Sequence, residues 1–222
     1  MRLRRIKGAD EMVQGSDFVI KDAKKHRGQW KEYFGNDHPL HLEIGMGKGK
    51  FLTTLALQNP DINYLGMERY TSVLIKGIAK LNAERESKEN TGNIRLLCED
   101  AAGICDMFEQ NEVDRIYLNF SDPWPKERHA ERRLTSSTFL AKYKEILKDD
   151  GELIFKTDNR SLFDFSVETI QAAHWQLVSV TYDLHHSEFA EGNVMTEYEE
   201  KFSAIGNPIC RLVAKKPPEN EI

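Results

Sequence analysis

The sequence predicts an α/β fold in which a mainly parallel, doubly wound sheet carries helices on both faces. Short apolar runs alternate with segments of helical spacing through most of the 222 residues, as right-handed β-α-β crossovers require. Acids or glycines follow nearly every apolar run, where open α/β sheets bind their ligands. We expect a single domain over residues 1–222, with a basic N-terminal arm over about residues 1–8 and a frayed C-terminal tail over about residues 215–222.

Seven strands are predicted from the apolar runs. In chain order they cover residues 40–45, 62–68, 93–100, 113–120, 151–158, 175–184 and 208–215. Apolar residues at helical spacing predict a helix over residues 49–58, stopped by Asn59 and Pro60, and a second around residues 73–81. A third helix runs through Phe139 and is expected to end at Gly151.

The composition is that of an ordinary globular protein, with 40% hydrophobic and 30% charged residues. No apolar run approaches the roughly 20 residues that span a bilayer, and the N-terminus lacks the apolar stretch of a signal peptide. We therefore expect a cytoplasmic protein that has no membrane partner. Cys98, Cys105 and Cys210 form no CxxC pair, so we expect free thiols and no metal site.

The first predicted strand ends in the glycine-rich stretch EIGMGKGKF. Gly45, Gly47 and Gly49 allow the backbone to turn tightly and to approach a ligand. A dinucleotide fingerprint would place its third glycine one residue later, where the sequence has Lys50. This departure disfavours an NAD-dependent dehydrogenase.

Three acids at consecutive strand ends favour a different cofactor. Glu43 precedes the glycine stretch, where a carboxylate would repel a pyrophosphate and attract a cation. Glu68 ends the second strand and is placed to accept hydrogen bonds from ribose hydroxyls. Asp100 ends the third strand and is placed to accept from an adenine amino group. S-adenosyl-L-methionine, which has a sulfonium, an ammonium group and no phosphate, suits this set.

The fourth predicted strand ends in SDPWP and continues into a basic run. Pro123 and Pro125 restrict the backbone beside Asp122, so its carboxylate is expected to be held in place. Residues 126–133 hold four cations against two acids, and the whole chain carries a net charge of −5. A local basic patch on an acidic protein is compatible with RNA binding, and equally with a solvated surface.

Four stretches together give a family resemblance over roughly residues 1–214: EIGMGKGKF, YLNFSDPWPKERHAERRLT, FKTDNR and TEYEEKF. They closely resemble the tRNA (guanine-N7-)-methyltransferases of the bacterial TrmB type. The resemblance implies a class I, Rossmann-like methyltransferase that uses S-adenosyl-L-methionine. The implied reaction methylates N7 of the guanosine at position 46, in the variable region of tRNA. KERHAERR is less basic than the corresponding segment of many relatives.

The resemblance also implies roles for individual residues. The cofactor-contacting acids are expected to be Glu43, Glu68, Asp100 and Asp122, and Asp122 is also the expected catalytic residue. The expected substrate-binding positions are Lys126, Asp158, Thr196, Glu197, Tyr198 and Glu199. The expected RNA-interacting segment spans residues 128–133 and includes Arg128, His129, Arg132 and Arg133. Members of the family occur as monomers and as homodimers, and we expect a homodimer.

The chemistry of the implied reaction constrains the role of Asp122. N7 of guanine has an in-plane lone pair and no proton, so its methylation needs no general base. We therefore expect Asp122 to position the base and to stabilise the positive charge that develops on it. Two alternatives remain: a nucleic-acid amino-methyltransferase, whose [DNS]PP[YF] motif would require a proline where Trp124 stands, and a non-catalytic RNA-binding module on the same scaffold.

Overall fold

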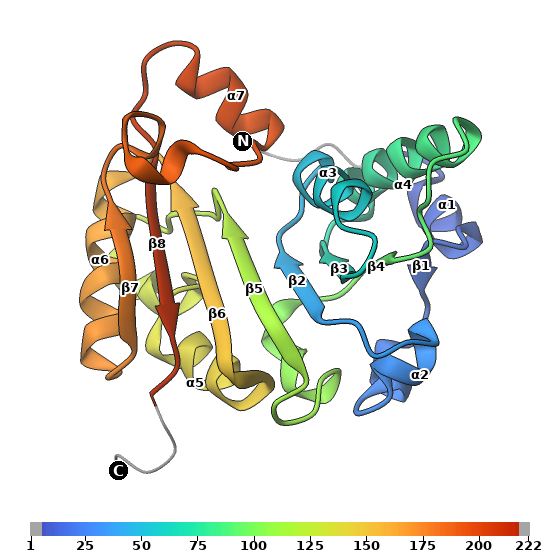
Figure 1. Ribbon diagram of the computed structural model, residues 1–222, viewed down its shortest axis with the longest axis horizontal. Helices are drawn as coiled ribbons and strands as arrows, with labels where there is room; N and C mark the ends of the chain where they lie inside the picture. The colour runs from blue at the N-terminus through green and yellow to red at the C-terminus, as the bar shows by residue number, and fades with distance from the viewer. Residues whose placement is uncertain (1–5, 218–222) are drawn as a thin grey trace.

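The computed structural model describes residues 6–217, which form one eight-stranded sheet in the order β1-β4-β3-β2-β5-β6-β8-β7 (Figure 1). The strands are β1 (Val19–Ile20), β2 (Leu40–Ile44), β3 (Asn63–Met67), β4 (Ile94–Leu97), β5 (Val113–Asn119), β6 (Leu147–Thr157), β7 (Gln176–Thr181) and β8 (Cys210–Lys215). Neighbouring strands pair in parallel except at β8, which runs antiparallel to β6 and β7. The predicted mainly parallel sheet is confirmed. The eighth strand is β1, whose two residues were too few to stand out in the sequence.

Helices cover both faces of the sheet. They are α1 (Ala9–Gly15), α2 (Trp30–Phe34), α3 (Lys50–Gln58), α4 (Thr71–Glu86), α5 (Ser137–Ile146), α6 (Arg160–Ala172) and α7 (Glu197–Ser203), with 3₁₀ turns η1 (Ala23–His26), η2 (Ala101–Asp106), η3 (Glu127–Arg132), η4 (Leu184–His186) and η5 (Glu188–Ala190). Residues of α2, α5 and α6 share one buried core with the sheet, and residues of α1, α3 and α4 share the core on its other face. This is the doubly wound arrangement that the alternating pattern predicts.

The end of α5 differs from the prediction. The helix ends at Ile146 and β6 begins at the next residue, so Gly151 lies inside a strand. A Cβ atom at Gly151 would lie 3.0 Å from the carbonyl oxygen of Lys148 and 3.1 Å from that of Asp114. The glycine therefore serves a close backbone approach within the sheet and does not cap the helix.

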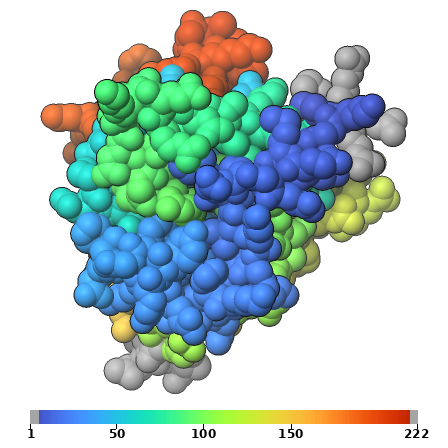
Figure 2. Space-filling model, turned by 90° about the vertical axis from the view of Figure 1, so that its right-hand side faces the viewer, coloured from blue at the N-terminus to red at the C-terminus, as the bar shows by residue number. Residues whose placement is uncertain are grey.

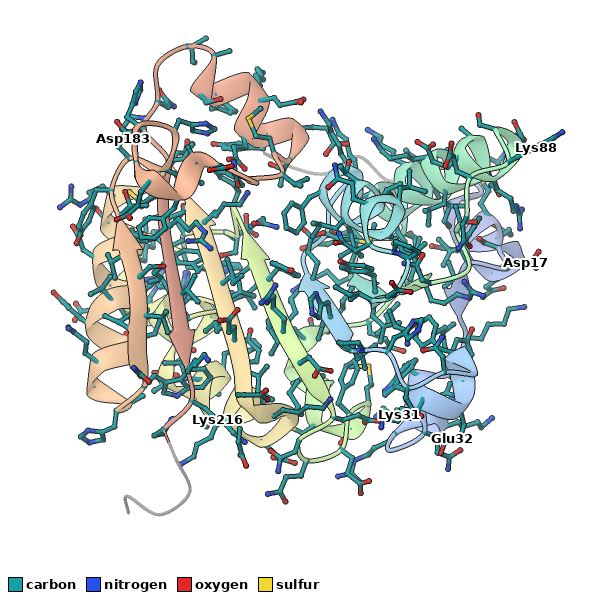
Figure 3. All side chains as sticks on the ribbon, in the orientation of Figure 1. Asp17, Lys31, Glu32, Lys88, Asp183 and Lys216 are labelled. Carbon is teal, nitrogen blue, oxygen red and sulfur yellow. The ribbon has the colours of Figure 1, made fainter. Side chains whose placement is uncertain are left out.

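The two predicted terminal extensions have different outcomes. Residues 1–5 of the basic arm lie outside the described residues. The predicted fraying is wrong for the first part of the tail: Lys215 belongs to β8, and Lys216 is buried, with its Nζ 2.6 Å from Asn111 Oδ1 and 2.9 Å from Asp149 Oδ1. Figure 3 shows Lys216 at the end of the sheet away from Asp183 and α7. Residues 218–222 are not described.

The carboxyl ends of the parallel strands meet at the edge of the sheet where α7 lies. In Figure 1, β5 and β6 point toward this edge and α7 crosses above them. Figure 2, seen from the side, shows α7 as a ridge at the top of the molecule, beyond α4. No helix within residues 6–217 is both long and apolar enough to cross a bilayer.

Candidate active site

A cavity of about 760 Å³ opens at the carboxyl ends of the strands. Its walls come from the segments that follow β2, β3, β4 and β5 and from α5. Residues on this wall include Gly45, Glu68, Asp100, Asp122, Trp124 and Arg132. The structure therefore gathers around one space several residues that the sequence predicted as a cofactor set.

The glycine loop between β2 and α3 is shaped by backbone conformations that side chains rarely adopt. Gly45, Gly47 and Gly49 have φ angles of 76°, 60° and 80°. The amides of Gly45 and Met46 both donate to the carbonyl oxygen of Met67, at 2.8 and 3.0 Å, which ties the loop to β3. A Cβ atom at Gly45 or Gly47 would meet nothing within 4 Å. The loop thus combines a left-handed backbone with open space in front of it.

Glu68 and Asp100 are held in place by backbone amides. Glu68 accepts from the amide of Gly47 at 3.3 Å and from that of Tyr70 at 3.0 Å. The carboxyl is largely buried, and burial raises its pKa while these amides lower it. Asp100 caps η2 by accepting from the amide of Ala102 at 2.9 Å and pairs with Arg69 at 3.3 Å. Both acids line the cavity as predicted.

Glu43 is placed differently from the other predicted cofactor acids. It is 1% exposed and does not line the cavity. Its Oε1 accepts from Asn119 Nδ2 at 2.8 Å, while its Oε2 and Asn119 Oδ1 have no hydrogen-bond partner among residues 6–217. Burial raises the pKa of Glu43 to about 8, and the amide of Asn119 and the charge of Lys156 lower it. Glu43 is thus a buried carboxyl group outside the cavity, held by Asn119.

The SDPWP loop leaves β5 through a strained backbone. Phe120, just before the loop, and Trp124, within it, have φ angles of 53° and 41°. Such conformations cost on the order of 1–3 kcal/mol each and persist where the surroundings enforce them. Between them Asp122 is exposed and lines the cavity, and its carboxylate has no hydrogen bond or ion pair among the described residues. The loop therefore holds a free carboxylate at the cavity.

Arg133 holds this loop through two hydrogen bonds to its carbonyl oxygens, and its predicted contact with RNA stays a prediction. Its Nε donates to the carbonyl oxygen of Pro123 and its Nη2 to that of Trp124, each at 3.1 Å. The guanidinium also lies 4.2 Å from the ring of Phe165. Two of the five N–H donors of Arg133 are thus used on this loop.

The other predicted RNA-contacting residues lie nearer to solvent. Arg132 is exposed and lies 5.0 Å over the ring of Trp124, and His129 meets the same ring edge-on at 5.7 Å. Lys126 and Arg128 are exposed. The structure thus brings an exposed basic segment next to Asp122.

The two predicted substrate stretches meet through Asp158 and Tyr198. The Tyr198 hydroxyl donates to Asp158 Oδ2 at 3.0 Å, and its ring lies 4.8 Å from that of Phe120. Burial, followed by the hydrogen bond to Asp158, raises the pKa of Tyr198 to about 12. Tyr198 is still 42% exposed. The geometry therefore joins the ends of β5 and β6 to the first turn of α7.

The remaining members of TEYE have internal partners, and their predicted contacts with substrate stay predictions. Thr196 caps α7, with its hydroxyl accepting from the amide of Glu199 at 3.0 Å. Glu197 pairs with Lys80 of α4 at 3.2 Å. Glu199 is fully buried and pairs with Lys156 at 2.6 Å. These side chains hold α7 on the sheet.

The sequence analysis missed Asn119 and Lys156, which hold the two predicted acids Glu43 and Glu199. A signal was present for Lys156: it lies in the apolar run LIFKT, at a strand position whose neighbours are buried. A lysine there needs an acidic partner, because an unpaired buried cation is costly.

Comparisons with known proteins agree with the motifs. A family model described as "Putative methyltransferase" matches residues 37–212. The protein is 58% identical over 219 residues to the tRNA (guanine-N(7)-)-methyltransferase of Lachnoclostridium phytofermentans, covering 99% of this chain and 100% of that one. The chain belongs to the tRNA (guanine-N(7)-)-methyltransferase family. The member of this family from Bacillus subtilis is 48% identical over 212 residues, covering 95% of this chain and 97% of that one.

Solved methyltransferases share the fold at low sequence identity. An antibiotic-related methyltransferase superposes with a TM-score of 0.62 at 16% identity, covering 86% of this chain and 94% of that one. A 16S rRNA (adenine(1408)-N(1))-methyltransferase from Catenulisporales acidiphilia, solved with its cosubstrate SAM, gives a TM-score of 0.55 at 14% identity, covering 100% and 96%. These likenesses confirm the predicted class I methyltransferase fold.

Proposed function

We propose that this protein transfers a methyl group from S-adenosyl-L-methionine to N7 of the guanosine at position 46 in the variable region of tRNA. Membership of the tRNA (guanine-N(7)-)-methyltransferase family supports the reaction. The observation that carries the proposal for the site is the free carboxylate of Asp122, held at the rim of a cavity that the glycine loop also lines. The side of the cavity lined by Gly45, Glu68 and Asp100 can bind a cofactor, and the exposed basic segment after Asp122 can bind RNA.

The residues around the cavity fit S-adenosyl-L-methionine. The open space at Gly45 and Gly47 allows a ligand to approach the backbone. Glu68 and Asp100 offer carboxylate oxygens to hydroxyl and amino donors. Behind the loop, Glu43 Oε2 and Asn119 Oδ1 are buried polar atoms without a hydrogen-bond partner among the described residues, and a bound cation would favour the ionised form of Glu43. When bound, the cofactor supplies an electrophilic methyl group on a sulfonium.

Asp122 acts on the base and does not remove a proton. N7 is already a free acceptor in the groove, so the protein has only to align it and to stabilise the purine as it becomes cationic. A fixed carboxylate beside the base provides this electrostatic stabilisation. The strained loop and Arg133 hold Asp122 before substrate arrives. The purine donors N1–H and the exocyclic amine are suitable partners for this carboxylate.

The exposed cations after the loop bind the RNA backbone. Lys126, Arg128 and Arg132 follow Asp122 directly in sequence and are exposed. They grip phosphates next to the target base and leave the reading of the base to Asp122 and Asp158. Affinity for tRNA should therefore fall steeply with salt concentration.

Asp122→Asn tests the electrostatic role. We expect kcat on tRNA that lacks 7-methylguanosine to fall about a hundredfold, because the variant keeps the shape and loses the charge. Cofactor affinity, measured by calorimetry, should fall much less than kcat, because Glu68 and Asp100 still line the cavity. Asp17→Asn, at an exposed position labelled in Figure 3, is the matched control. Near wild-type turnover by Asp122→Asn would contradict the role, and nucleoside mass spectrometry of the product would reveal an amino-methyltransferase.

A cytoplasmic location follows from the tRNA substrate, and we propose a homodimer as the assembly. Light scattering coupled to size-exclusion chromatography measures the assembly directly. A monomeric mass at micromolar concentration would contradict the proposed homodimer and leave the methyl transfer unaffected.

A further inference from the structure

A buried polar network lies beneath α7 and has no part in the reaction as described so far. Lys156, on β6, is 2% exposed, and its Nζ lies 2.6 Å from Glu199 Oε2. The same Nζ donates to Asn193 Oδ1 at 3.1 Å and to the carbonyl oxygen of Val194 at 2.9 Å. All three partners come from the chain between β7 and β8. The ammonium group of Lys156 therefore binds this segment at three points.

Glu199 is equally committed to the network. It is fully buried, and its Oε1 accepts from Asn193 Nδ2 at 2.7 Å. His185 Nε2 lies 3.2 Å from the same oxygen. The buried carboxylate and the buried ammonium group compensate each other's charge. Removing either partner would leave the other as an uncompensated buried charge, which is strongly destabilising.

The helix that carries Glu199 has little apolar support. None of the three buried hydrophobic clusters in the described chain contains a residue of α7. Besides the buried network, α7 is held by ion pairs from Glu197 to Lys80 and from Glu200 to Lys50, and by the Tyr198 contacts. Polar contacts therefore set where α7 lies. Figure 1 shows the helix above the ends of β5 and β6.

Lys156 also touches the other two parts of the site. Its carbonyl oxygen accepts from the amide of Phe120 at 2.8 Å, at the start of the loop that carries Asp122. On the neighbouring strand β5 it stands opposite Asn119, which holds Glu43. Lys156 thus contacts the start of the SDPWP loop through its backbone and α7 through its side chain.

We propose that Lys156 is a positioning residue that docks α7 through Glu199 and so sets Tyr198 and Asp158 at the correct place relative to Asp122. The proposal rests on the proposed methylation of tRNA, because α7 then presents its first turn to the RNA. The Lys156–Glu199 pair acts on RNA binding through the helix and does not touch the RNA itself.

Glu199→Gln and Lys156→Met test the proposal, with Lys148→Met as the matched control. Lys148 lies on the same strand and forms an ion pair of 2.7 Å with Asp114, at the end of the sheet away from the cavity. We expect each test variant to raise KM for tRNA about tenfold, because the binding surface is no longer preorganised. The affinity for S-adenosyl-L-methionine should stay within about twofold, and the control should leave both constants unchanged.

Hydrogen exchange gives a readout that does not depend on activity. In the test variants, exchange of the amides in residues 197–203 should rise at least tenfold relative to wild type, with β2 and β5 unchanged. If a single variant does not fold, Lys156→Met combined with Glu199→Met leaves no unpaired buried charge and carries the same test. Unchanged exchange in α7, or equal losses of cofactor and tRNA binding, would overturn the proposal. A wild-type protein that fails to methylate tRNA would instead overturn the proposed function, while the exchange result would still decide the docking role.

Discussion

The two halves of the cavity are built in different ways. At the ends of β2 and β3 the glycine loop is tied down by backbone amides, which donate to Met67 and to Glu68. At the ends of β5 and β6 the chain is held by side chains: Arg133 on the loop and Lys156 beneath α7. The first half is stabilised locally, and the second depends on partners that are distant in the sequence.

This difference matches what each half has to do. A cofactor of fixed shape is served by a rigid backbone cradle, and the sheet supplies that rigidity through its own hydrogen bonds. A large RNA has to bring one base to the cavity over a wide contact surface, and polar contacts hold α7 there without making it part of the hydrophobic core. We therefore expect substitutions in the two halves to affect different measurements.

Glu43 lies where the halves meet and should give the largest change in stability. It faces Asn119, Lys156, Glu197 and Glu68, and burial raises its pKa to about 8 from an ordinary value of 4.5. The folded protein keeps a proton on Glu43 that the unfolded chain releases, so this contribution to stability is lost as pH rises from 4.5 toward 8. Glu43→Gln removes that dependence. Urea unfolding of the cofactor-free proteins should show the variant gaining about 3 kcal/mol relative to wild type between pH 5.5 and pH 8.

The control for this measurement is Glu89→Gln, which removes an exposed carboxylate elsewhere. Parallel pH profiles for wild type and Glu43→Gln would show that Glu43 is already ionised in the folded protein. The charge of Lys156, which lowers the pKa of Glu43, would then outweigh the cost of burying the carboxylate.

Arg133 should change turnover about as much as Asp122 does, within the second half. Arg133→Met removes two hydrogen bonds from the carbonyls beside Asp122, so the loop can relax from its strained backbone. We expect kcat to fall about a hundredfold, with cofactor affinity unchanged, because a small misplacement of Asp122 is costly. Arg133→Lys, which cannot bridge both carbonyls, should fall in between. Arg128→Met is the matched control from the exposed part of the same segment and should raise KM for tRNA only slightly.

The outcome also decides between the two roles considered for Arg133. If Arg133→Met raises KM for tRNA and leaves kcat intact, the residue contacts RNA as the sequence suggested. The second half would then be less dependent on internal side-chain joints than its geometry indicates.

Most of the fold could be predicted because its signals are local. The seven longer strands, α3 and α4 follow from apolar spacing within a few residues, and short turns or glycines delimit them. The end of α5 was misplaced because a glycine occurs both at helix ends and in strands where the backbone is crowded. The sequence alone does not distinguish these two settings for Gly151. The two-residue strand β1 exists only because its partner β4 is present.

In the candidate site, too, the features with local signals could be predicted and the contacts between distant residues could not. Gly45, Glu68, Asp100 and Asp122 could be placed at one edge because each follows a parallel strand, and such ends converge. The partners of Arg133 and Glu199 could not be predicted, because a motif shows which residues occur and not which atoms they contact. Glu199 and its partner Lys156 are 43 residues apart, and Lys50 and Glu200 are 150 apart.

Gly45 gives the smallest and most selective test of the first half. Gly45→Ala and Gly35→Ala add the same methyl group at φ angles of 76° and 70°, and in both cases the new Cβ meets no atom within 4 Å. Each should therefore lose about 1–2 kcal/mol of stability through backbone strain alone. Only Gly45 lines the cavity, so only Gly45→Ala should weaken binding of S-adenosyl-L-methionine, by about tenfold in calorimetry. Equal cofactor affinity in the two variants would mean that the ligand does not approach this backbone, and the cradle would have to be sought around Glu68 and Asp100 instead.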